Sequence, residues 1–265
     1  MSDQSTLLNL GPAVWLLLAL LLAVASVVAR QALGMPARRL WFAGARALLQ
    51  LAVVAGAVAS LSRSAALSAA FLLLMLLVAA WTAARRIGAA PHITALPILA
   101  GVVPVAGLML ATGVLPVQPL AWLAVCGQLI GGAMTAVNLA GRRIGAELRV
   151  RRGEVEAGLA LGLPPQAARA LVARPVAHEA LLPALDQTRT VGTVTLPGAF
   201  VGLVLGGAPP LEAGVVQLVV LVSLLAVEAI AVAVLARLAE AGHLEQPLAP
   251  YPRPGRPRVG GRARG

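Results

Sequence analysis

Apolar residues in this chain gather into long runs that are separated by short polar stretches. A helix needs roughly 20 mostly apolar residues to cross the hydrocarbon core of a bilayer. Seven runs approach that length, so the pattern predicts seven membrane-spanning helices. The second run carries Arg46 near its start, and the sixth is short and broken by Pro197. The predicted spans cover residues 11–29, 43–61, 65–82, 92–112, 119–140, 190–207 and 213–236.

One long hydrophilic segment, residues 141–189, follows the fifth span. Glu147, Arg151 and Glu154 occur there at helical spacing, so opposite charges can pair along one helix face. We therefore expect the fifth span to continue as a helix beyond the membrane.

Further along the same segment, the pattern predicts a short helix held between two turns. Gly162 interrupts the helical pattern, and Pro164 and Pro165 suit a loop followed by the first turn of a helix. The Ala-rich run that comes next favours a helix. Arg174 precedes Pro175, and the residue before a proline avoids the helical region, so we expect this helix to end there.

The sixth span contains a break near its middle. Leu196 is followed by Pro197, which removes a helical hydrogen bond, and by Gly198, which adds backbone freedom. In transporters, broken helices at mid-membrane often build the substrate site. Gly198, Gly202 and Gly206 also form a smooth edge against which another helix can pack. The alternative is a kinked packing helix without substrate contact.

A few polar residues fall inside the predicted spans. Glu228 is the only acid deep in a span, and Gln217 lies eleven residues earlier, on the same helix face. Gln128 and Asn138 likewise share a side of the fifth span. Such residues are costly in a membrane and usually functional, so these two faces are candidates for one translocation path. The alternatives are an ion pair of Glu228 with Arg46 and interhelical hydrogen bonds of the two amides.

The composition places this pattern in an integral membrane protein of the all-α class. Of the 265 residues, 59% are hydrophobic and 12% are charged, and the mean hydropathy is +0.88. A soluble domain of this length cannot bury so large an apolar share. We expect one transmembrane domain over residues 1–245 and a disordered tail over residues 246–265, which are rich in Arg, Pro and Gly.

The basic residues exclude several functions. All 21 of them are Arg, and the net charge is +11. Without Lys the chain cannot form the phosphate-gripping loop of P-loop ATPases, so ATP-driven work requires another polypeptide. The single Cys126 excludes an internal disulfide. Because the arginines flank apolar runs and aromatic residues are few, the charge does not indicate nucleic-acid binding.

The same arginines predict the orientation of the chain. Loops that stay in the cytoplasm are enriched in Arg and Lys. With the N-terminus outside, seven spans put every arginine except Arg63 on the cytoplasmic side. We therefore expect a multi-pass protein whose C-terminus is cytoplasmic.

The segment around the predicted short helix resembles the EAA loop of ABC-transporter permeases. Glu156-Ala157-Gly158 takes the place of Glu-Ala-Ala, and Gly162 follows after three residues. After nine further residues, Val172–Pro175 replaces Ile-x-Leu-Pro. In that family the short helix docks in a groove of the ATPase and transmits its closure. The alternative is an ordinary helical hairpin. The resemblance implies a coupling role for Glu156, Ala157, Gly162, Pro164, Pro165, Val172, Arg174 and Pro175.

The stretch from residue 186 to residue 217 resembles the FetB-type permease family, iron export permeases that work with a separate ATPase. That family's signature is approximately Asp-x-Thr-Lys-Thr-Val-Gly, followed by Leu-Pro-Gly-Met-Met-Thr-Gly. A second-span match extends the resemblance over nearly the whole chain. The matching residues are Arg46, Gln50, Asp186, Thr188, Arg189, Thr190, Gly192, Leu196, Pro197, Gly198, Gly202, Gly206, Gly207 and Gln217, with Arg189 in place of Lys.

This resemblance implies the membrane subunit of an ABC transporter, not an enzyme. Two permease copies would pair with two ATPase subunits, which bind ATP and Mg, and the permease itself would carry no cofactor. The expected activity is export of iron or another metal cation across the bacterial inner (plasma) membrane. Ala199, Phe200 and Val201 stand where the family has Met-Met-Thr, so no metal ligand is carried over there.

Three other functions remain open at this point. The first is an ABC permease for a nucleotide sugar or another anionic solute. The second is an ion-coupled secondary transporter that uses Glu228 and needs no ATPase. The third is a membrane anchor for a cytoplasmic partner, in which Glu228 and the break at Pro197 could be replaced without effect.

Overall fold

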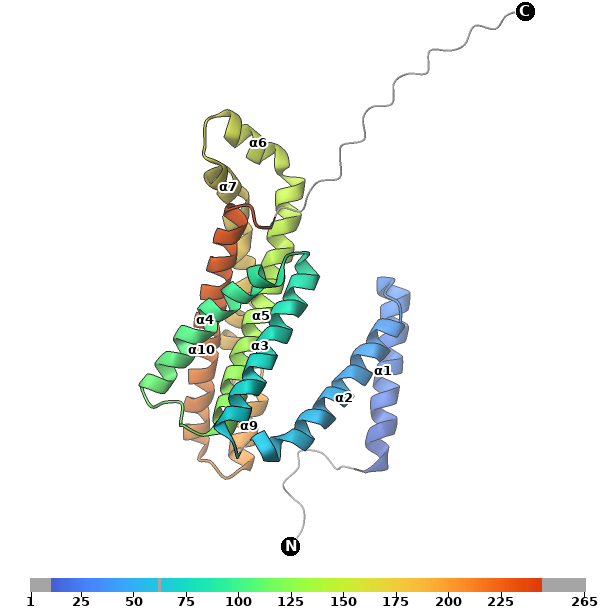
Figure 1. Cartoon of the computed structure of the whole chain (residues 1–265). Helices are drawn as coiled ribbons and strands as arrows, with labels where there is room; N and C mark the ends of the chain where they lie inside the picture. The colour runs from blue at the N-terminus through green and yellow to red at the C-terminus, as the bar shows by residue number, and fades with distance from the viewer. Residues whose placement is uncertain (1–10, 62, 245–265) are drawn as a thin grey trace, which may run out of the picture.

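The computed structural model describes residues 11–61 and 63–244, which fold into a bundle of α-helices (Figure 1). Within these ranges the only β-type pairing is an isolated bridge between Val191 and Thr195. Six helices are long and apolar enough to cross a membrane, so the fold is all-α and multi-pass, as the composition predicts. They are α1 (Pro12–Leu33), α2 (Arg38–Leu61), α3 (Ala65–Ile87), α4 (Pro91–Ala111), α5 (Pro119–Val150) and α10 (Pro210–Glu240).

These six helices coincide with predicted spans one to five and seven. Four of them, α1, α4, α5 and α10, begin with a proline, which has no N–H to leave unpaired in the first turn. Gly34 (φ 62°) and Gly88 (φ 72°) end α1 and α3 in the left-handed conformation that glycine adopts most easily. The predicted tail, residues 246–265, lies outside the described residues.

The sixth predicted span is not one helix. It consists of the end of α8 (Leu182–Thr190), a non-helical stretch and the eight-residue α9 (Gly198–Leu205). Pro197 is extended (φ −63°, ψ 143°) and precedes α9 instead of kinking a continuous helix. A proline inside the helix would clash with the preceding turn, so a new start at Gly198 is the less strained solution. α9 lies against α10, at the end of the bundle opposite residues 152–177 (Figure 1).

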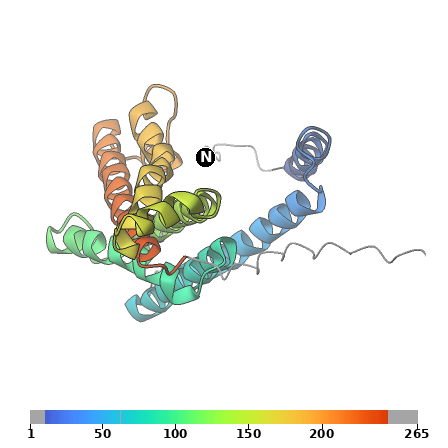
Figure 2. The ribbon, with the colours of Figure 1, turned by 90° about the horizontal axis from the view of Figure 1, so that it is seen from above.

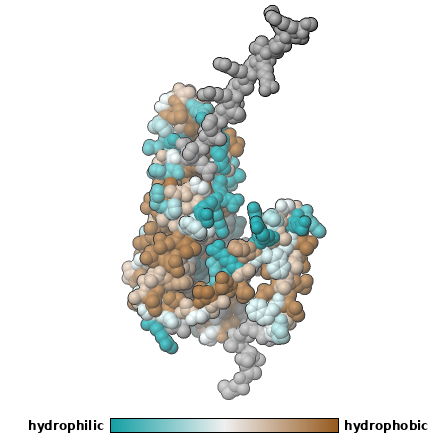
Figure 3. Space-filling model, turned by 45° about the vertical axis from the view of Figure 1, so that its right-hand side comes forward, coloured by the Kyte–Doolittle hydropathy of each residue, from teal (hydrophilic) through white to brown (hydrophobic). Residues whose placement is uncertain are grey.

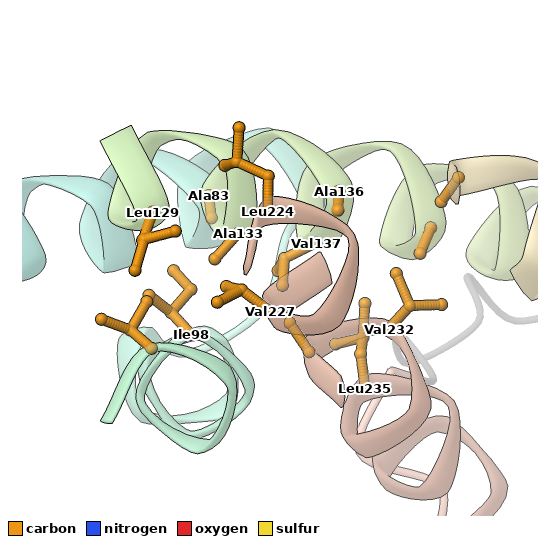
Figure 4. Close-up of a cluster of buried hydrophobic side chains, with 14 of the residues drawn as sticks. Ala83, Ile98, Leu129, Ala133, Ala136, Val137, Leu224, Val227, Val232 and Leu235 are labelled. Carbon is orange, nitrogen blue, oxygen red and sulfur yellow. The ribbon is translucent and has the colours of Figure 1, made fainter. Parts of the chain in front are cut away.

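The core lies where α3, α4, α5 and α10 meet (Figure 4). Small residues let these helices approach closely, which is how helices pack in a membrane. The tightest approach is at Gly101 of α4, where an added Cβ would lie 2.5 Å from the carbonyl oxygen of Val227 in α10. Large fully buried side chains, Ile98, Leu129 and Leu235 among them, fill the remaining space.

The predicted packing edge on α9 is not used within the chain. An added Cβ at Gly198 or Gly202 would meet no other atom within 4 Å, and one at Gly206 would meet only carbonyls of its own helix. The expected close helix contact is therefore absent among the described residues. The edge stays available to lipid or to another polypeptide.

The first two helices form a hairpin that stands apart from the bundle (Figure 2). Within the described part of the chain, α1 packs only against α2, and α2 touches α3 and α5 lightly. A Cβ added at Gly44 would lie 2.9 Å from Leu22, which marks the contact between the two helices. Most of the apolar surface of this hairpin is left for lipid or another protein chain.

The longest helices extend beyond the thickness of a bilayer core. At about 1.5 Å per residue, the 32 residues of α5 reach roughly 48 Å, whereas the hydrocarbon core is about 30 Å thick. The excess carries α6 (Arg152–Ala160) and α7 (Pro165–Ala177) away from the apolar part of the molecule (Figure 1). In Figure 3 hydrophobic side chains gather over the lower part of the bundle and hydrophilic ones toward the α6–α7 end.

Candidate functional site

The hairpin of α6 and α7 follows the predicted pattern at its turn. Gly162 adopts a positive φ of 88°, and the N–H of Leu163 donates to the carbonyl of Gly158 at 3.0 Å. Pro164 is extended and α7 begins at Pro165. The predictions of a turn at Gly162 and of a short helix after the two prolines are confirmed.

The predicted end of this helix is wrong. α7 continues through Pro175 to Ala177 and passes into the 3₁₀ helix η1 (His178–Leu181). Val172 and Ala173 are fully buried on one side of Pro175, and Val176 and Ala177 are buried on the other. Packing of this face against α5 and α10 outweighs the local preference of the residue before proline.

Two arginines tie α7 to the end of α10. The Arg174 Nε donates to Glu240 Oε1 at 2.7 Å, and its Nη2 donates to Oε2 at 3.2 Å. Arg169 Nη1 donates to the backbone carbonyl of Glu240 at 3.3 Å. The hydrogen bond with Glu240 raises the pKa of the Arg174 guanidinium further above its ordinary value. Because Glu240 is nearly buried and ends α10, α7 is held to that end by a charged, bidentate contact.

Other ion pairs follow the outer part of α5 and α6. Arg151 binds Glu154 through two contacts of 2.7 and 2.6 Å, which lowers the pKa of Glu154, whereas Glu147 lies 3.8 Å from Arg143. The predicted continuation of the fifth span into the hydrophilic segment is thus confirmed as far as Val150. Arg151 pairs with Glu154 as expected, but Glu154 lies on α6 and Glu147 pairs with Arg143 instead of Arg151. Ala157 is exposed, and Glu156 pairs with Arg152 at 2.6 Å on the surface. Surface pairs of this kind contribute little to stability.

A cavity of about 280 Å³ opens beside the break before α9. Leu196, Pro197 and Phe200 line one side, and Gln217 of α10 lines the other. Gln217 is 4% exposed, and its Oε1 has no hydrogen-bond partner among the described residues. Two elements selected from the sequence, the Pro-Gly break and Gln217, therefore meet at one hollow, beside which the Gln217 Oε1 is buried and unpaired.

Glu228 does not join this cavity. It is half-buried and its carboxylate lies against α5, where a Cβ added at Gly132 would come within 2.8 Å of Oε1. None of the ion pairs between described residues involves Glu228, so the alternative pair with Arg46 is not made. Gln217 and Glu228 are thus about three turns of α10 apart and have different surroundings, so they do not form one site.

The two amides of α5 are also separated. Gln128 is exposed, whereas Asn138 is buried with neither side-chain polar atom paired among the described residues. The two amides therefore have different surroundings and do not form one common polar surface. A buried amide with two unpaired atoms is unusual and calls for a ligand, a water or a partner group.

Several signature residues have conformational roles. Thr188 and Thr190 donate to the carbonyls of Ala184 and Asp186, which are one turn earlier in α8, at 2.8 Å each. Gly192 (φ 80°) and Gly207 (φ 93°) adopt the left-handed region in the turns before and after α9. Of the other signature positions, Arg189 lies in the last turn of α8, and Arg46 and Gln50 are exposed on α2.

No group of three or more His, Cys, Asp or Glu that could hold a metal ion occurs in the described part of the chain. The sequence also gave no sign of the contacts of Arg169 and Arg174 with Glu240, because these residues are 71 and 66 positions apart.

The fold and these sites define an α-helical, multi-pass membrane protein. The sequence profile of the uncharacterised protein family UPF0014 matches residues 12–242, and the chain belongs to this family. No solved structure matches it significantly.

Relatives in plants and bacteria extend the comparison. The chain is 39% identical over 196 residues to UPF0014 membrane protein STAR2 of Oryza sativa subsp. japonica, covering 72% of this chain and 68% of that protein. It is 35% identical to Protein ALUMINUM SENSITIVE 3 of Arabidopsis thaliana, over 56% of each chain. It is 31% identical over 218 residues to "Probable iron export permease protein FetB" of Escherichia coli, over 79% and 83% of the two chains.

Proposed function

We propose that this chain is the membrane-spanning permease subunit of an ABC transporter, and that ATP is hydrolysed by a separate ATPase subunit in the cytoplasm. The observation that carries this proposal is α7, a short helix presented beyond the apolar part of the bundle. Its inner face is buried against α5 and α10, and Arg174 fixes it to Glu240. A helix placed in this way can be displaced by a partner and can transmit the displacement to the membrane-spanning helices.

The outer side of this hairpin suits a docking surface. Leu161 is 84% exposed and Leu171 is 52% exposed, although both lie at the hydrophilic end of the molecule. Leu159 and Leu163 are also exposed on the same hairpin. A group of exposed apolar residues away from lipid marks an interaction site. Because the chain has no Lys, a P-loop must come from the partner.

In the proposed mechanism, the displacement of α7 is transmitted along α10. Closure of the ATPases on bound ATP displaces α7, and Arg174 and Arg169 carry the end of α10 with it. α10 also forms the wall of the cavity at Gln217, so the displacement changes the access of that cavity to either side of the membrane. Two permease copies are expected, and the unused edge at Gly198 and Gly202 leaves room for the second.

For the substrate we propose a metal cation, iron in the first instance, moved out of the cytoplasm. The support is the name of the Escherichia coli relative and the buried, unpaired oxygen of Gln217 beside the cavity, since hard cations prefer oxygen ligands. One copy supplies one such oxygen, and a pair of copies facing each other would supply two.

A reconstituted ATPase assay tests the subunit class. Wild-type permease in liposomes is expected to bind a candidate ATPase and change its ATP turnover, whereas Leu161→Glu places a charge on the docking surface and abolishes the effect. Val117→Glu is the matched control, because Val117 is 81% exposed on the opposite end of the bundle. Equal effects of the two variants would refute docking at this hairpin.

A transport assay on the same vesicles tests the substrate. ATP-dependent movement of iron that requires both subunits is expected, with a Gln217→Met permease transporting less. Stimulation by nucleotide sugars and not by metals would overturn the substrate and leave the subunit class intact. Transport that runs on a proton gradient without any ATPase would overturn the class.

A further inference from the structure

A second and larger hollow lies where α3 ends beside the outer half of α5. It has a volume of about 680 Å³ and is separate from the cavity at Gln217. Its walls carry five guanidinium groups and, among the described residues, no carboxylate. We call this hollow the arginine cleft, and its arginines are Arg85, Arg86, Arg142, Arg143 and Arg149.

Most of this positive charge is not neutralised by the protein. Arg143 binds Glu179 at 2.9 Å and approaches Glu147, while Arg85 stacks over the Trp81 ring at 4.7 Å. The ion pairs between described residues include none with Arg86, Arg142 or Arg149. Like charges that line one concave surface repel one another, so an anion in the cleft would relieve that repulsion.

The cleft lies at the depth of lipid headgroups. Trp81 is half exposed one turn before Arg85, and Trp is enriched where the membrane meets water. Leu139 is 40% exposed and lies just before Arg142, so apolar surface borders the cleft on one side. On the other side α5 continues toward the hydrophilic α6–α7 end (Figure 1).

Small residues create the space. An added Cβ at Gly141 would come within 2.9 Å of Ile87, so α3 and α5 are in close contact at the base of the cleft. At Gly145 an added Cβ would meet only Arg149 Nη1, at 3.8 Å, and so would point into the hollow. A side chain at position 145 would therefore occupy part of the cleft.

We propose that the arginine cleft binds the phosphate group of an anionic lipid headgroup from the surrounding membrane. Guanidinium groups form bidentate hydrogen bonds with phosphate oxygens, and basic pockets between helices on the cytoplasmic side suit acidic lipids. Continuity of the cleft with the exposed side chain of Leu139 favours a lipid over free phosphate. A bound lipid would link α3 to α5 close to Arg143. Because Arg143 forms an ion pair with Glu179, just after α7, the lipid would also stabilise the position of the α6–α7 hairpin.

A general excess of positive charge on this side would not need a cleft. The positive-inside rule needs only arginines somewhere on the cytoplasmic side. Lipid binding in the cleft needs these particular arginines and the space between them. The test therefore compares loss of charge inside the cleft with equal loss outside it, and with loss of volume at unchanged charge.

Native mass spectrometry of the purified full chain measures lipid binding. Phosphatidylglycerol is expected to bind wild type, with phosphatidylcholine and inorganic phosphate as separate arms. Arg142→Gln with Arg149→Gln is expected to weaken phosphatidylglycerol binding by about tenfold or more, since each lost charged hydrogen bond is worth that order. Gly145→Leu keeps every charge, places a side chain on the cleft wall and is expected to weaken binding comparably.

Arg38→Gln with Arg237→Gln is the matched control, because both arginines are exposed, lie outside the cleft and are predicted to face the cytoplasm. This control is expected to bind phosphatidylglycerol like wild type, and helical content by circular dichroism verifies that all variants are folded. If inorganic phosphate binds as strongly as the lipid, the lipid as occupant is overturned. If both cleft variants bind lipid like wild type, the site itself is overturned.

Discussion

Gln217 and Asn138 show at the residue scale how stability and transport can oppose each other. Gln217 buries one polar side-chain atom, and Asn138 two, that have no partner among the described residues. A buried unpaired polar group typically costs about 1–3 kcal/mol. A fold that retains such groups on two of its central helices gives up stability, and sites of that kind are often functional.

We expect Gln217→Met to raise the free energy of unfolding by about 1 kcal/mol or more while lowering transport, because it removes the unpaired oxygen and keeps most of the volume. Thermal unfolding in detergent and transport in proteoliposomes measure the two effects. Gln128→Met is the control, since Gln128 is exposed and its replacement should change neither strongly. A destabilised Gln217→Met protein would mean that the oxygen is satisfied by a group outside the described residues.

Arg174 and Glu240 offer a second test at this scale. Arg174→Glu or Glu240→Arg should break the contact between α7 and α10 and uncouple ATP turnover from transport, because a nearly buried end of α10 loses its partner. Combining both substitutions restores opposite charges and should recover part of the coupling. The ratio of solute moved to ATP hydrolysed is the measurement. Recovery of stability without recovery of that ratio would indicate a purely structural contact.

At the scale of elements, the close approach of α4 and α10 sets how the core can vary. Gly101→Ala forces a Cβ to within 2.5 Å of the Val227 carbonyl and should destabilise the protein by about 1–3 kcal/mol. Gly107→Ala in the same helix meets nothing within 4 Å and should be neutral or stabilising by about 0.5–1 kcal/mol. Chemical or thermal unfolding of the two variants gives the comparison, and equal stabilities would contradict this packing.

How far the sequence predicts each element depends on the range of its cause. The long spans and the turn at Gly162 follow from local composition, so they were predictable. The passage of α7 through Pro175 was not, because the burial of Val172 and its neighbours against two distant helices decides it. The contact between Arg174 and Glu240 joins residues 66 positions apart, and neither the spacing nor the charge pattern reveals it.

The candidate cavity lies between these cases. The sequence singled out Pro197 and Gln217 separately, each for a local reason. Their meeting across one hollow depends on how the stretch before α9 folds back on α10, since Pro197 caps a new helix where a kinked helix was expected. Glu228 was grouped with Gln217 by helical spacing, yet its neighbour is Gly132 of α5.

At the scale of the whole molecule, the two ends of the bundle should face opposite sides of the membrane. With Cys126 replaced by Ala, single cysteines at positions 117 and 161 would report the two ends separately. We expect Val117→Cys to react with a membrane-impermeant maleimide from outside the cell, and Leu161→Cys only after the cytoplasm is opened, because the arginines favour that orientation. Labelling of both positions from the same side would contradict a membrane crossing by α5, which separates them.

Because α10 is one unbroken helix from Pro210 to Glu240, it fixes both the distance and the angle between the cavity wall and the anchor of α7. One residue inserted between Gln217 and Glu240 would turn one of them about 100° against the other and shift it about 1.5 Å along the axis. Either the cavity or the anchor would then lose its partners, even though the helix itself would remain intact. The number of residues in α10 therefore sets the spacing between the cavity and the α7 anchor. Many substitutions within the helix can be tolerated, but an insertion or deletion cannot.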